Sequence, residues 1–422
     1  MKKTIVTIAT MIAGIALNAA NAAPLPETKP DDVGFSQQGL SRLDDFFARE
    51  IAAKRVPGAV VAIARDGKLV HYKAYGQLDA AKGTAMPLDA VFALASMTKP
   101  MAAVGGLTLM EQGRLPLQSK LADYYPSFDD MKVGVPQPDG SLKLEPQVSP
   151  IHIHDLYRHT SGLIYGGRPD SPSLVARLYP DGTAPAIEGD AQAFIERITK
   201  LPLVHQPSTE FEYGFSIDVL GAVVEKVSEQ RLGDYLAAHV WGPLGMKDAT
   251  FHPSEAQRAR LARPFPNDPL TGKPQAISLL DTQTKFDCGG ACSFSTVGDY
   301  IRFGQMLLNG GELDGQRMLS PQTVHLMTSN HLGREIKNNV AKIEPHRGGF
   351  SFGLGVAVRT HEGLASVPGN PGEFTWNGAY GTQFICDPKE HLVVVVGTAA
   401  PGELRKYYRE QVQDIVYGAM VR

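Results

Sequence analysis

The chain has 422 residues, 43% of them hydrophobic, and a formal net charge of −3 with both signs interspersed. The lack of a basic stripe argues against a nucleic-acid partner, and the length suffices for a large core with two subdomains. No group of His and Cys has the spacing of a zinc site, and the sequence implies neither a metal nor another cofactor.

The chain opens with the features of an export signal. Two lysines precede a mostly apolar run from Ile5 to Leu17, and Ala20-Asn21-Ala22 has the small-x-small pattern of a cleavage site. A membrane anchor would need roughly 20 apolar residues. We therefore predict that residues 1–22 are a signal peptide removed after Ala22. The mature protein is expected in the periplasm or secreted, with no stable membrane insertion.

The first elements of the mature chain predict a helix followed by a hairpin. Ser36 can cap a helix that runs to Lys54, where apolar residues recur at helical spacing. Strands are predicted at 59–65 and 68–75, because the Asp66-Gly67 turn between two apolar runs is a strong hairpin signal. A second helix, carrying Ser96, is predicted to end near Gln112. An antiparallel sheet therefore begins in this part of the chain.

The middle of the chain differs in character, with frequent Pro, Asp and aromatic residues and with helical patterns separated by long loops. Its predicted helices cover about 154–159, 190–200, 216–227 and 232–241. Beyond Ser293 the predicted elements are a helix at 300–308 capped near Ser295-Thr296, strands at 350–359, 378–387 and 391–397, and a final helix at 403–420.

This order of elements predicts a mixed α/β (α+β) fold. An antiparallel sheet is expected to be flanked by helices from both chain ends, with a mostly helical subdomain inserted. We assign the α/β subdomain to about 36–113 and 288–422, and the helical subdomain to about 114–287. Residues 23–422 are then one domain.

Three cysteines occur, at 288, 292 and 386. Cys288 and Cys292 are near enough in sequence to bridge in an exported protein, and the sequence leaves open whether they do. A bridge there would act on local shape, because so short a ring removes little chain entropy. Cys386 lies in a strand pattern and is expected to be a buried free thiol.

A Ser-x-x-Lys sequence, Ser96-Met97-Thr98-Lys99, is the first candidate for chemistry. A serine hydroxyl needs a base within hydrogen-bond reach, and residues three apart share one face of a helix. The small, apolar residues around Lys99 suit a desolvated lysine. About one such pattern should occur by chance in a chain of this length, so the rest of the chain must support it.

Two later stretches offer partners. Tyr213 precedes a helix start in a turn-forming context, and a nearby lysine would ease loss of its proton. The stretch 372–382 is a strand interrupted by glycines, which lets a ligand approach the backbone. The amides of Ala379 and of Ser96 could together form an oxyanion hole.

Three motifs in this order resemble those of the serine β-lactamases and penicillin-binding proteins, and within them class C β-lactamases and family VIII carboxylesterases. Ser96 and Lys99, then Tyr213, then Trp376-Asn377-Gly378 stand in the places of the family's Ser-x-x-Lys, Tyr-x-Asn and Lys-Thr-Gly motifs. The stretches 156–163 and 295–311 match as well. The resemblance covers essentially the whole mature chain.

Departures from the family pattern bear on the substrate. Phe215 replaces an Asn that would hydrogen-bond a lactam side-chain amide, which Phe cannot do. Trp376 and Asn377 replace the Lys and Thr that pair with a substrate carboxylate, and a missing cation should cost about 1.5–3 kcal/mol. The Trp-x-Gly form ending at Gly378 resembles family VIII esterases. These four residues are expected to contact the substrate, and they favour a neutral ester over an anionic β-lactam.

The resemblance implies a serine hydrolase that works on a small-molecule ester through an acyl-enzyme. Ser96 would attack the carbonyl, Lys99 with Tyr213 would take the proton, and the amides of Ser96 and Ala379 would hold the oxyanion. Whether Lys99 or Tyr213 is the base stays open. A β-lactamase or D-alanyl-D-alanine carboxypeptidase could use the same residues, and a non-catalytic binding protein of this fold is a further alternative.

Two other patterns are set aside. Gly349-Phe350-Ser351-Phe352-Gly353 matches the Gly-x-Ser-x-Gly elbow, which requires a strand, a sharp turn and a helix. Here the alternation continues through 354–358 and predicts one uninterrupted strand, so Ser351 is not expected to be the nucleophile. His159 closes a short helix at a Thr-Ser-Gly turn, and we interpret it as structural.

Overall fold

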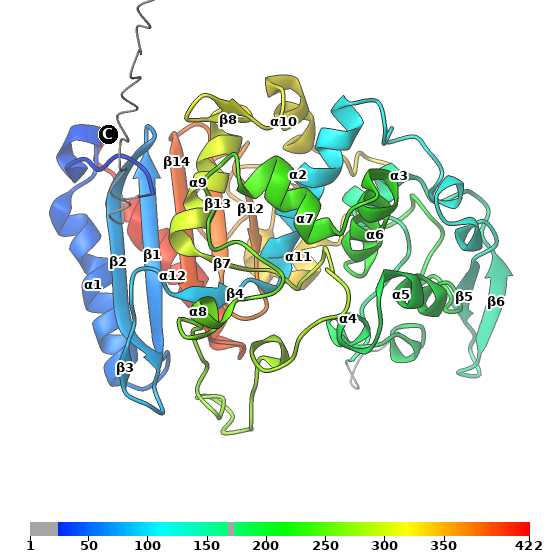
Figure 1. Cartoon of the computed structure of the whole chain (residues 1–422), viewed down its shortest axis with the longest axis horizontal. Coiled ribbons are helices and arrows are strands. Elements are labelled where there is room, and N and C mark those ends of the chain that lie inside the picture. Colours follow the sequence, from blue (N-terminus) through cyan, green and yellow to red (C-terminus); the bar gives the residue numbers. More distant parts are fainter. Residues whose placement is uncertain (1–23, 168–172) are drawn as a thin grey trace, which may run out of the picture.

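The computed structural model describes residues 24–167 and 173–422 (Figure 1). The predicted signal peptide, residues 1–22, lies outside the described residues. Within the described ranges, no helix has both the length and the apolar character needed to cross a membrane.

An antiparallel sheet forms one side of the molecule. Its strands are ordered β10-β11-β12-β13-β14-β1-β2-β3. Their bounds are β1 (Gly58–Arg65), β2 (Lys68–Asp79), β3 (Thr84–Ala85), β10 (Phe350–Phe352), β11 (Ala357–Arg359), β12 (Phe374–Asn377), β13 (Gln383–Asp387) and β14 (Leu392–Thr398). Strand β1 pairs with β14 from Ala59 opposite Thr398 to Arg65 opposite Leu392. The two ends of the chain therefore meet in the middle of the sheet.

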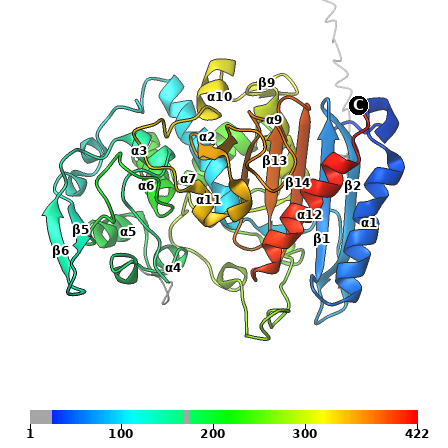
Figure 2. The same cartoon turned by 180° about the vertical axis from the view of Figure 1, so that it is seen from behind.

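Helices from both chain ends cover one face of the sheet. Helix α1 (Gln37–Ala52) begins at Ser36, whose hydroxyl accepts a hydrogen bond from the Gly39 amide at 3.1 Å, as predicted. Helix α12 (Leu404–Gly418) lies beside it on the same face (Figure 2). Alternate residues of β1 and β14, such as Val61 and Val394, pack against these helices. The predicted sheet with flanking helices is confirmed.

The opposite face packs on α9 (Val297–Leu308) and on the larger core. Behind α9 lies α2 (Thr98–Glu111), which is buried along almost its whole length, as an all-round apolar helix should be. Its glycines allow close neighbours: a Cβ on Gly106 would lie 2.2 Å from the Tyr157 hydroxyl. Helix α2 thus stands between the sheet and the helices of the middle part of the chain, against which it packs.

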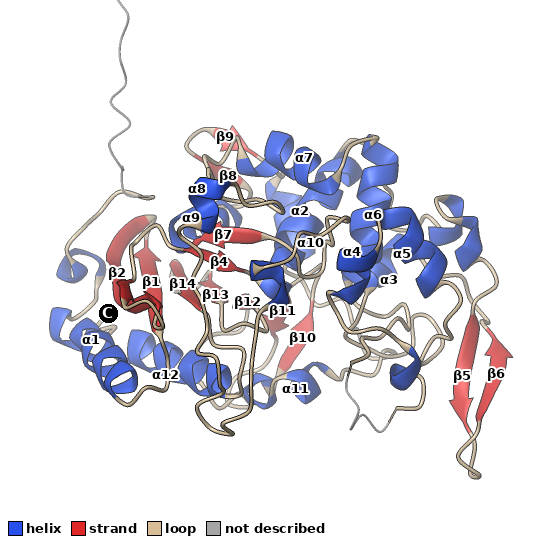
Figure 3. Cartoon of the chain, turned by 60° about the horizontal axis from the view of Figure 1, so that its bottom comes forward, coloured by secondary structure: helices blue, strands red, loops and turns tan. Residues whose placement is uncertain are grey.

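The helical side of the molecule lies beyond α2 (Figures 1 and 3). Its helices are α3 (Ile153–Tyr157), α4 (Ala184–Glu188), α5 (Ala191–Ile198), α6 (Ser216–Ser228) and α7 (Leu232–Leu236), whereas α8 (Glu255–Arg258) lies near α9 on the sheet side. A hairpin of β5 (Lys132–Pro136) and β6 (Leu142–Pro146), which the sequence did not predict, projects at the far end. All these elements fall within 114–287, although the subdomain boundaries themselves stay a prediction.

The remaining elements are short. They are the strand pair β4 (Val91–Ala93) and β7 (Phe294–Thr296), the pair β8 (Glu312–Leu313) and β9 (Gln316–Arg317), and helices α10 (Pro321–Met327) and α11 (Val340–Ile343).

Two predicted strands are wrong in the same way. The predicted strand 350–359 is two strands, β10 and β11, joined by a turn in which the Gly353 amide donates to the Val356 carbonyl at 2.8 Å. Gly355, at φ +85°, permits this turn. Likewise the predicted strand 378–387 begins only at Gln383, because residues 378–381 form a turn with Gly381 at φ +109°. In both places the glycines reverse the chain, whereas the apolar alternation alone predicted continuity.

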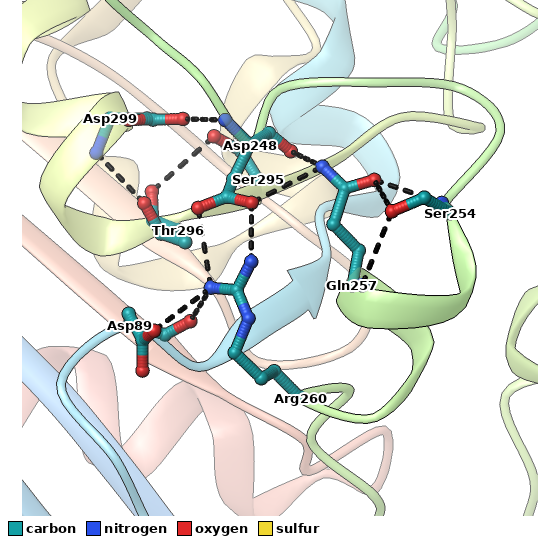
Figure 4. A network of polar contacts seen from close by, with 8 residues as sticks. All are labelled: Asp89, Asp248, Ser254, Gln257, Arg260, Ser295, Thr296 and Asp299. Atoms are coloured by element: carbon teal, nitrogen blue, oxygen red, sulfur yellow. Dashed lines mark hydrogen bonds and ion pairs between the residues drawn. The ribbon is translucent and has the colours of Figure 1, made fainter.

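A polar network anchors the strand that leads to Ser96 (Figure 4). The Arg260 guanidinium bonds the carboxylates of Asp248 at 2.5 Å and Asp89 at 3.2 Å, and the Asp248 amide donates to the Asp299 carboxylate at 2.6 Å. The Arg260 carbonyl in turn accepts from the amide of Val91, the first residue of β4. Burial raises the pKa of Asp299 to about 6. The network thus ties β4 to the N-terminal turn of α9.

Candidate active site

Ser96 and Lys99 meet at the N-terminal end of α2. Strand β4 ends at Ala93, and Ser96 lies in a single 3-10 turn, Ala95–Met97, that runs directly into α2. The Lys99 Nζ atom is 3.3 Å from the Ser96 Oγ atom. Lys99 is fully buried and Ser96 is half-buried. The geometry agrees with the contact predicted from the three-residue spacing.

The Lys99 ammonium has two further hydrogen-bond partners. It donates to the Tyr165 hydroxyl at 3.1 Å and to the Gly290 carbonyl at 2.8 Å. Behind these partners lies the buried carboxylate of Asp218, which accepts from the Tyr165 hydroxyl at 2.9 Å and from the Gly290 amide at 3.0 Å. Asp218 is therefore linked to Lys99 through Tyr165 and Gly290, and neither carboxylate oxygen bonds Lys99 directly.

Burial has the largest effect on the pKa values of Asp218 and Tyr165. It raises the pKa of Asp218 to about 6, although the charge of Lys99 acts in the opposite direction. Burial and then the Asp218 charge raise the pKa of Tyr165 well above its usual value. Tyr165 therefore stays a phenol that donates to Asp218 while its oxygen accepts from Lys99.

Tyr213 approaches Lys99 through its ring. The Lys99 Nζ atom lies 4.5 Å from the centre of the Tyr213 ring. The Tyr213 hydroxyl accepts a hydrogen bond from the indole N–H of Trp376 at 3.2 Å. The fold thus brings together the three predicted motifs, which lie far apart in sequence.

His159 supports Tyr213 from behind. Its ring lies 4.8 Å from that of Tyr213 and 5.5 Å from that of Phe352. Among the residues that the structure describes, neither of its ring nitrogens has a hydrogen-bond partner. Burial, and then the charge of Lys99, lower the pKa of His159 well below its usual value. His159 is therefore neutral and packs as an aromatic ring, in keeping with the structural role we predicted.

Asp155 holds the Tyr213 loop to the His159 turn. Its buried carboxylate accepts from the hydroxyls of Thr160 and Ser208, each at 2.6 Å, and from Arg158 at 3.0 Å. The Glu212 amide donates to the His159 carbonyl at 2.8 Å. These bonds fix the backbone next to Tyr213.

The turn at 378–382 brings Ala379 toward the Ser96 segment. The Thr382 hydroxyl donates to the Leu94 carbonyl at 3.1 Å, and a Cβ on Gly378 would lie only 2.2 Å from the same carbonyl oxygen. Within the described ranges the amide of Ala379 donates no hydrogen bond. Ser96 stands in the first turn of a helix, where amides have no intrahelical partner.

Arg409 of α12 determines how this turn is oriented. Its guanidinium, 2% exposed, bonds the Gly378 carbonyl and also the Thr382 carbonyl at 3.4 Å. In a trans peptide the carbonyl and the next N–H point in opposite directions. Holding the Gly378 carbonyl toward α12 therefore turns the Ala379 N–H away from α12. Arg409 is itself paired with the Glu344 carboxylate at 2.7 Å.

Two residues predicted to contact the substrate, Phe215 and Asn377, are buried. Phe215, 1% exposed, packs behind Tyr165 with ring centres 4.5 Å apart. Asn377 follows Trp376 on a strand, so its side chain points to the opposite sheet face. Trp376, itself 2% exposed, contacts Tyr213, whereas Phe215 packs behind Tyr165 and Asn377 points to the other face of its strand. Their contact with substrate stays a prediction.

Comparison with known proteins decides the family. A match to the Beta-lactamase family spans residues 43–416. The chain belongs to the Beta-lactamase family. It is similar to Protein Rv1367c of Mycobacterium tuberculosis, 33% identical over 82% of this chain and 87% of that protein. It is also similar to Esterase EstB of Burkholderia gladioli, 29% identical over 87% of this chain and 93% of that protein.

The solved structures that resemble this chain include EstCE1, a hydrolase with promiscuous acyltransferase activity. It superposes on this Beta-lactamase-family chain with a TM-score of 0.73, covering 90% of this chain and 99% of EstCE1 at 25% identity. The predicted resemblance is therefore confirmed, and the family is one of serine hydrolases that includes esterases.

Sequence reasoning missed several residues of this Beta-lactamase-family site, among them Tyr165, Asp218, Gly290 and Arg409. Tyr165 and Gly290 are 66 and 191 residues from Lys99. No spacing rule connects residues so far apart. Arg347 was missed as well, and its guanidinium stacks on the Trp376 ring at 4.5 Å.

Ser351 stands on β10, where its hydroxyl donates to the Asn330 side-chain carbonyl. The chain there runs strand, turn, strand, so the elbow geometry is absent from these described residues. The prediction against Ser351 agrees with this geometry, although the predicted continuous strand was wrong.

Proposed function

We propose that this protein cleaves carboxylic esters through an acyl-enzyme formed on Ser96. The observation that carries the proposal is the buried Lys99 side-chain nitrogen 3.3 Å from the Ser96 hydroxyl, where its neutral amine can accept the proton. A serine becomes a useful nucleophile only when a neighbouring group can take its proton. The similarity to Esterase EstB and to the hydrolase EstCE1 supports the same reaction class.

In the proposed reaction Ser96 attacks the ester carbonyl as its proton passes to the coupled pair of Lys99 and Tyr213. The Lys99 Nζ atom lies 4.5 Å from the Tyr213 ring centre, so we assign the base role to the pair and not to one residue. The amides of Ser96 and Ala379 would hold the oxyanion. The Tyr213 hydroxyl would then protonate the leaving alcohol, and water would release the acid.

The neutral ester is favoured over a β-lactam because of Trp376. It occupies the place where β-lactamases have a lysine for the substrate carboxylate, and its indole N–H is already bonded to the Tyr213 hydroxyl. Loss of a charge-assisted hydrogen bond should weaken the binding of an anionic substrate by about 1.5–3 kcal/mol.

We further propose that the protein acts outside the cytoplasm. The Cys288–Cys292 disulfide supports this location, because such bonds persist mainly in oxidising compartments. Mass spectrometry of the exported protein should find an N-terminus at Ala23, and a chain that keeps Met1 in the cell would contradict the proposal.

The function is tested with a short-chain nitrophenyl ester. Ser96→Ala should abolish turnover, whereas the matched control Ser351→Ala should keep it. A fluorophosphonate probe should label Ser96 in the wild-type protein, and an unlabelled protein would point to a binding role instead. Parallel assays with nitrocefin separate the β-lactamase alternative: a rate on nitrocefin far above that on the ester would overturn the substrate assignment.

A further inference from the structure

We propose that the Cys288–Cys292 disulfide is a positioning device for Lys99. The bridge closes the ring Cys288-Gly289-Gly290-Ala291-Cys292, and the ring presents the Gly290 carbonyl to the Lys99 ammonium. The proposal rests on the proposed function, in which Lys99 takes part in activating Ser96.

The ring bonds Lys99 and Asp218 through the carbonyl and the amide of a single residue, Gly290. The Gly290 carbonyl accepts from Lys99 at 2.8 Å, which is shorter than the lysine's contacts with Ser96 at 3.3 Å and Tyr165 at 3.1 Å. The Gly290 amide donates to the Asp218 carboxylate at 3.0 Å. A rotation of the peptides on either side of Gly290 would break one of these two bonds.

Neighbouring helices enclose the ring. A Cβ on Gly289 would lie 2.7 Å from the Ile217 carbonyl of α6 and 3.3 Å from the Ala102 side chain of α2. A Cβ on Gly290 would lie 2.2 Å from an Asp218 carboxylate oxygen. Only a backbone without side chains can pass between α2 and α6 here, so two consecutive glycines are required.

The residue after the bridge is joined to the Ser96 segment. The Ser293 hydroxyl lies 2.7 Å from the Thr98 hydroxyl, and the Ser293 carbonyl accepts from the Leu94 amide at 2.9 Å. The ring and the turn that carries Ser96 and Lys99 thus form one connected unit.

The two glycines that permit this approach also leave the loop flexible, because glycine has the widest range of backbone conformations. A bridge across so short a ring adds little through chain entropy but restricts the local conformations. Without the bridge, the Gly290 carbonyl could move off the ammonium, and Lys99 would lose its shortest hydrogen bond. A displacement of about 1 Å in a reacting group can reduce the rate about 100-fold.

The test compares the wild-type protein with Cys288→Ser/Cys292→Ser and with a matched control, Cys386→Ser, which changes the buried free thiol. On a nitrophenyl ester, the double variant should lose at least about tenfold in kcat while KM stays within about twofold. The Cys386→Ser variant should keep wild-type kcat. A folded double variant with wild-type kcat would overturn the proposal.

A second readout does not depend on ester turnover. Acetic anhydride labelling of the Lys99 amine, followed by mass spectrometry, should be faster in the double variant because the Gly290 carbonyl no longer holds this nitrogen. Equal labelling in both proteins overturns the positioning role. A wild-type protein that neither hydrolyses the ester nor labels at Ser96 instead refutes the proposed function.

If the double variant fails to fold, Gly290→Ala provides the alternative test. It keeps the disulfide but places a Cβ against Asp218, so the same peptide must shift. This variant should also lose at least about tenfold in kcat. Wild-type kcat in Gly290→Ala would show that the Gly290 peptide does not position Lys99, and the proposal would then be wrong.

Discussion

Replacing Arg409 with Met tests whether this arginine orients the predicted oxyanion hole. Arg409 is 2% exposed, and its guanidinium bonds the Gly378 carbonyl on the far side of the peptide from the Ala379 amide. Burial lowers the pKa of Arg409 to about 10, against the opposing effect of Glu344, so the side chain stays charged at neutral pH. Met has a similar length and can occupy the same buried space without the charge.

The structure sets the size of both expected effects. Removing Arg409 alone leaves the Glu344 carboxylate, otherwise bonded at 2.7 Å, without this partner, and breaking a buried pair costs about 3–5 kcal/mol of unfolding free energy. Full loss of one oxyanion donor costs about 100- to 1000-fold in kcat. The Gly381 amide still donates to the Gly378 carbonyl at 3.1 Å. The turn is thus partly retained, and we expect a loss of about 10- to 100-fold.

The double variant Arg409→Met/Glu344→Gln separates the two effects. It removes both charges, so the unfolding free energy measured in urea should return most of the way to the wild-type value. The loss in kcat on a nitrophenyl ester should persist with little change in KM, because the Gly378 carbonyl still lacks its bond from Arg409. Recovery of kcat together with stability would refute the reasoning, since the arginine would then matter only to folding.

Two other predictions follow from the same contacts. Tyr165→Phe removes the hydroxyl between Lys99 and Asp218, a bond to a charged group worth about 1.5–3 kcal/mol, so kcat should fall about 10- to 100-fold; wild-type kcat would exclude a role for this hydroxyl. Burial raises the pKa of Glu344, but the charge of Arg409 and its arginine neighbours outweighs burial and lowers this pKa from 4.5 to about 2. The resulting stability is present above pH 4.5 and is lost as pH falls toward 2, by up to about 3 kcal/mol. The unfolding free energy of the wild-type protein, measured in urea, should therefore fall more steeply over this pH range than that of Glu344→Gln. Parallel declines in the two proteins would contradict the prediction.

Local rules in the sequence determined the elements that depend on neighbouring residues. Helix α1 with its Ser36 cap and the β1–β2 hairpin at Asp66-Gly67 appear as predicted. The contact of Ser96 with Lys99 also follows from sequence, because three residues make about one helical turn. The order of the three motifs was enough to indicate the family, now shown by the match over residues 43–416.

The sequence alone misjudged the strands at 350–359 and 378–387, since apolar alternation does not reveal where a glycine reverses the chain. It also left open the pairing of Cys288 with Cys292, which the fold joins.

The tertiary structure alone decided what surrounds Lys99. Tyr165, Asp218 and the Gly290 carbonyl reach it from three separate segments, and Arg409 approaches the Gly378 peptide from the last helix. These contacts depend on how α2 packs against α6 and how α12 packs on the sheet, and packing over such sequence separations leaves no periodic trace in the chain. The sequence therefore determined the contact between the predicted nucleophile, Ser96, and Lys99, whereas only the tertiary packing determined the groups that hold the lysine in place.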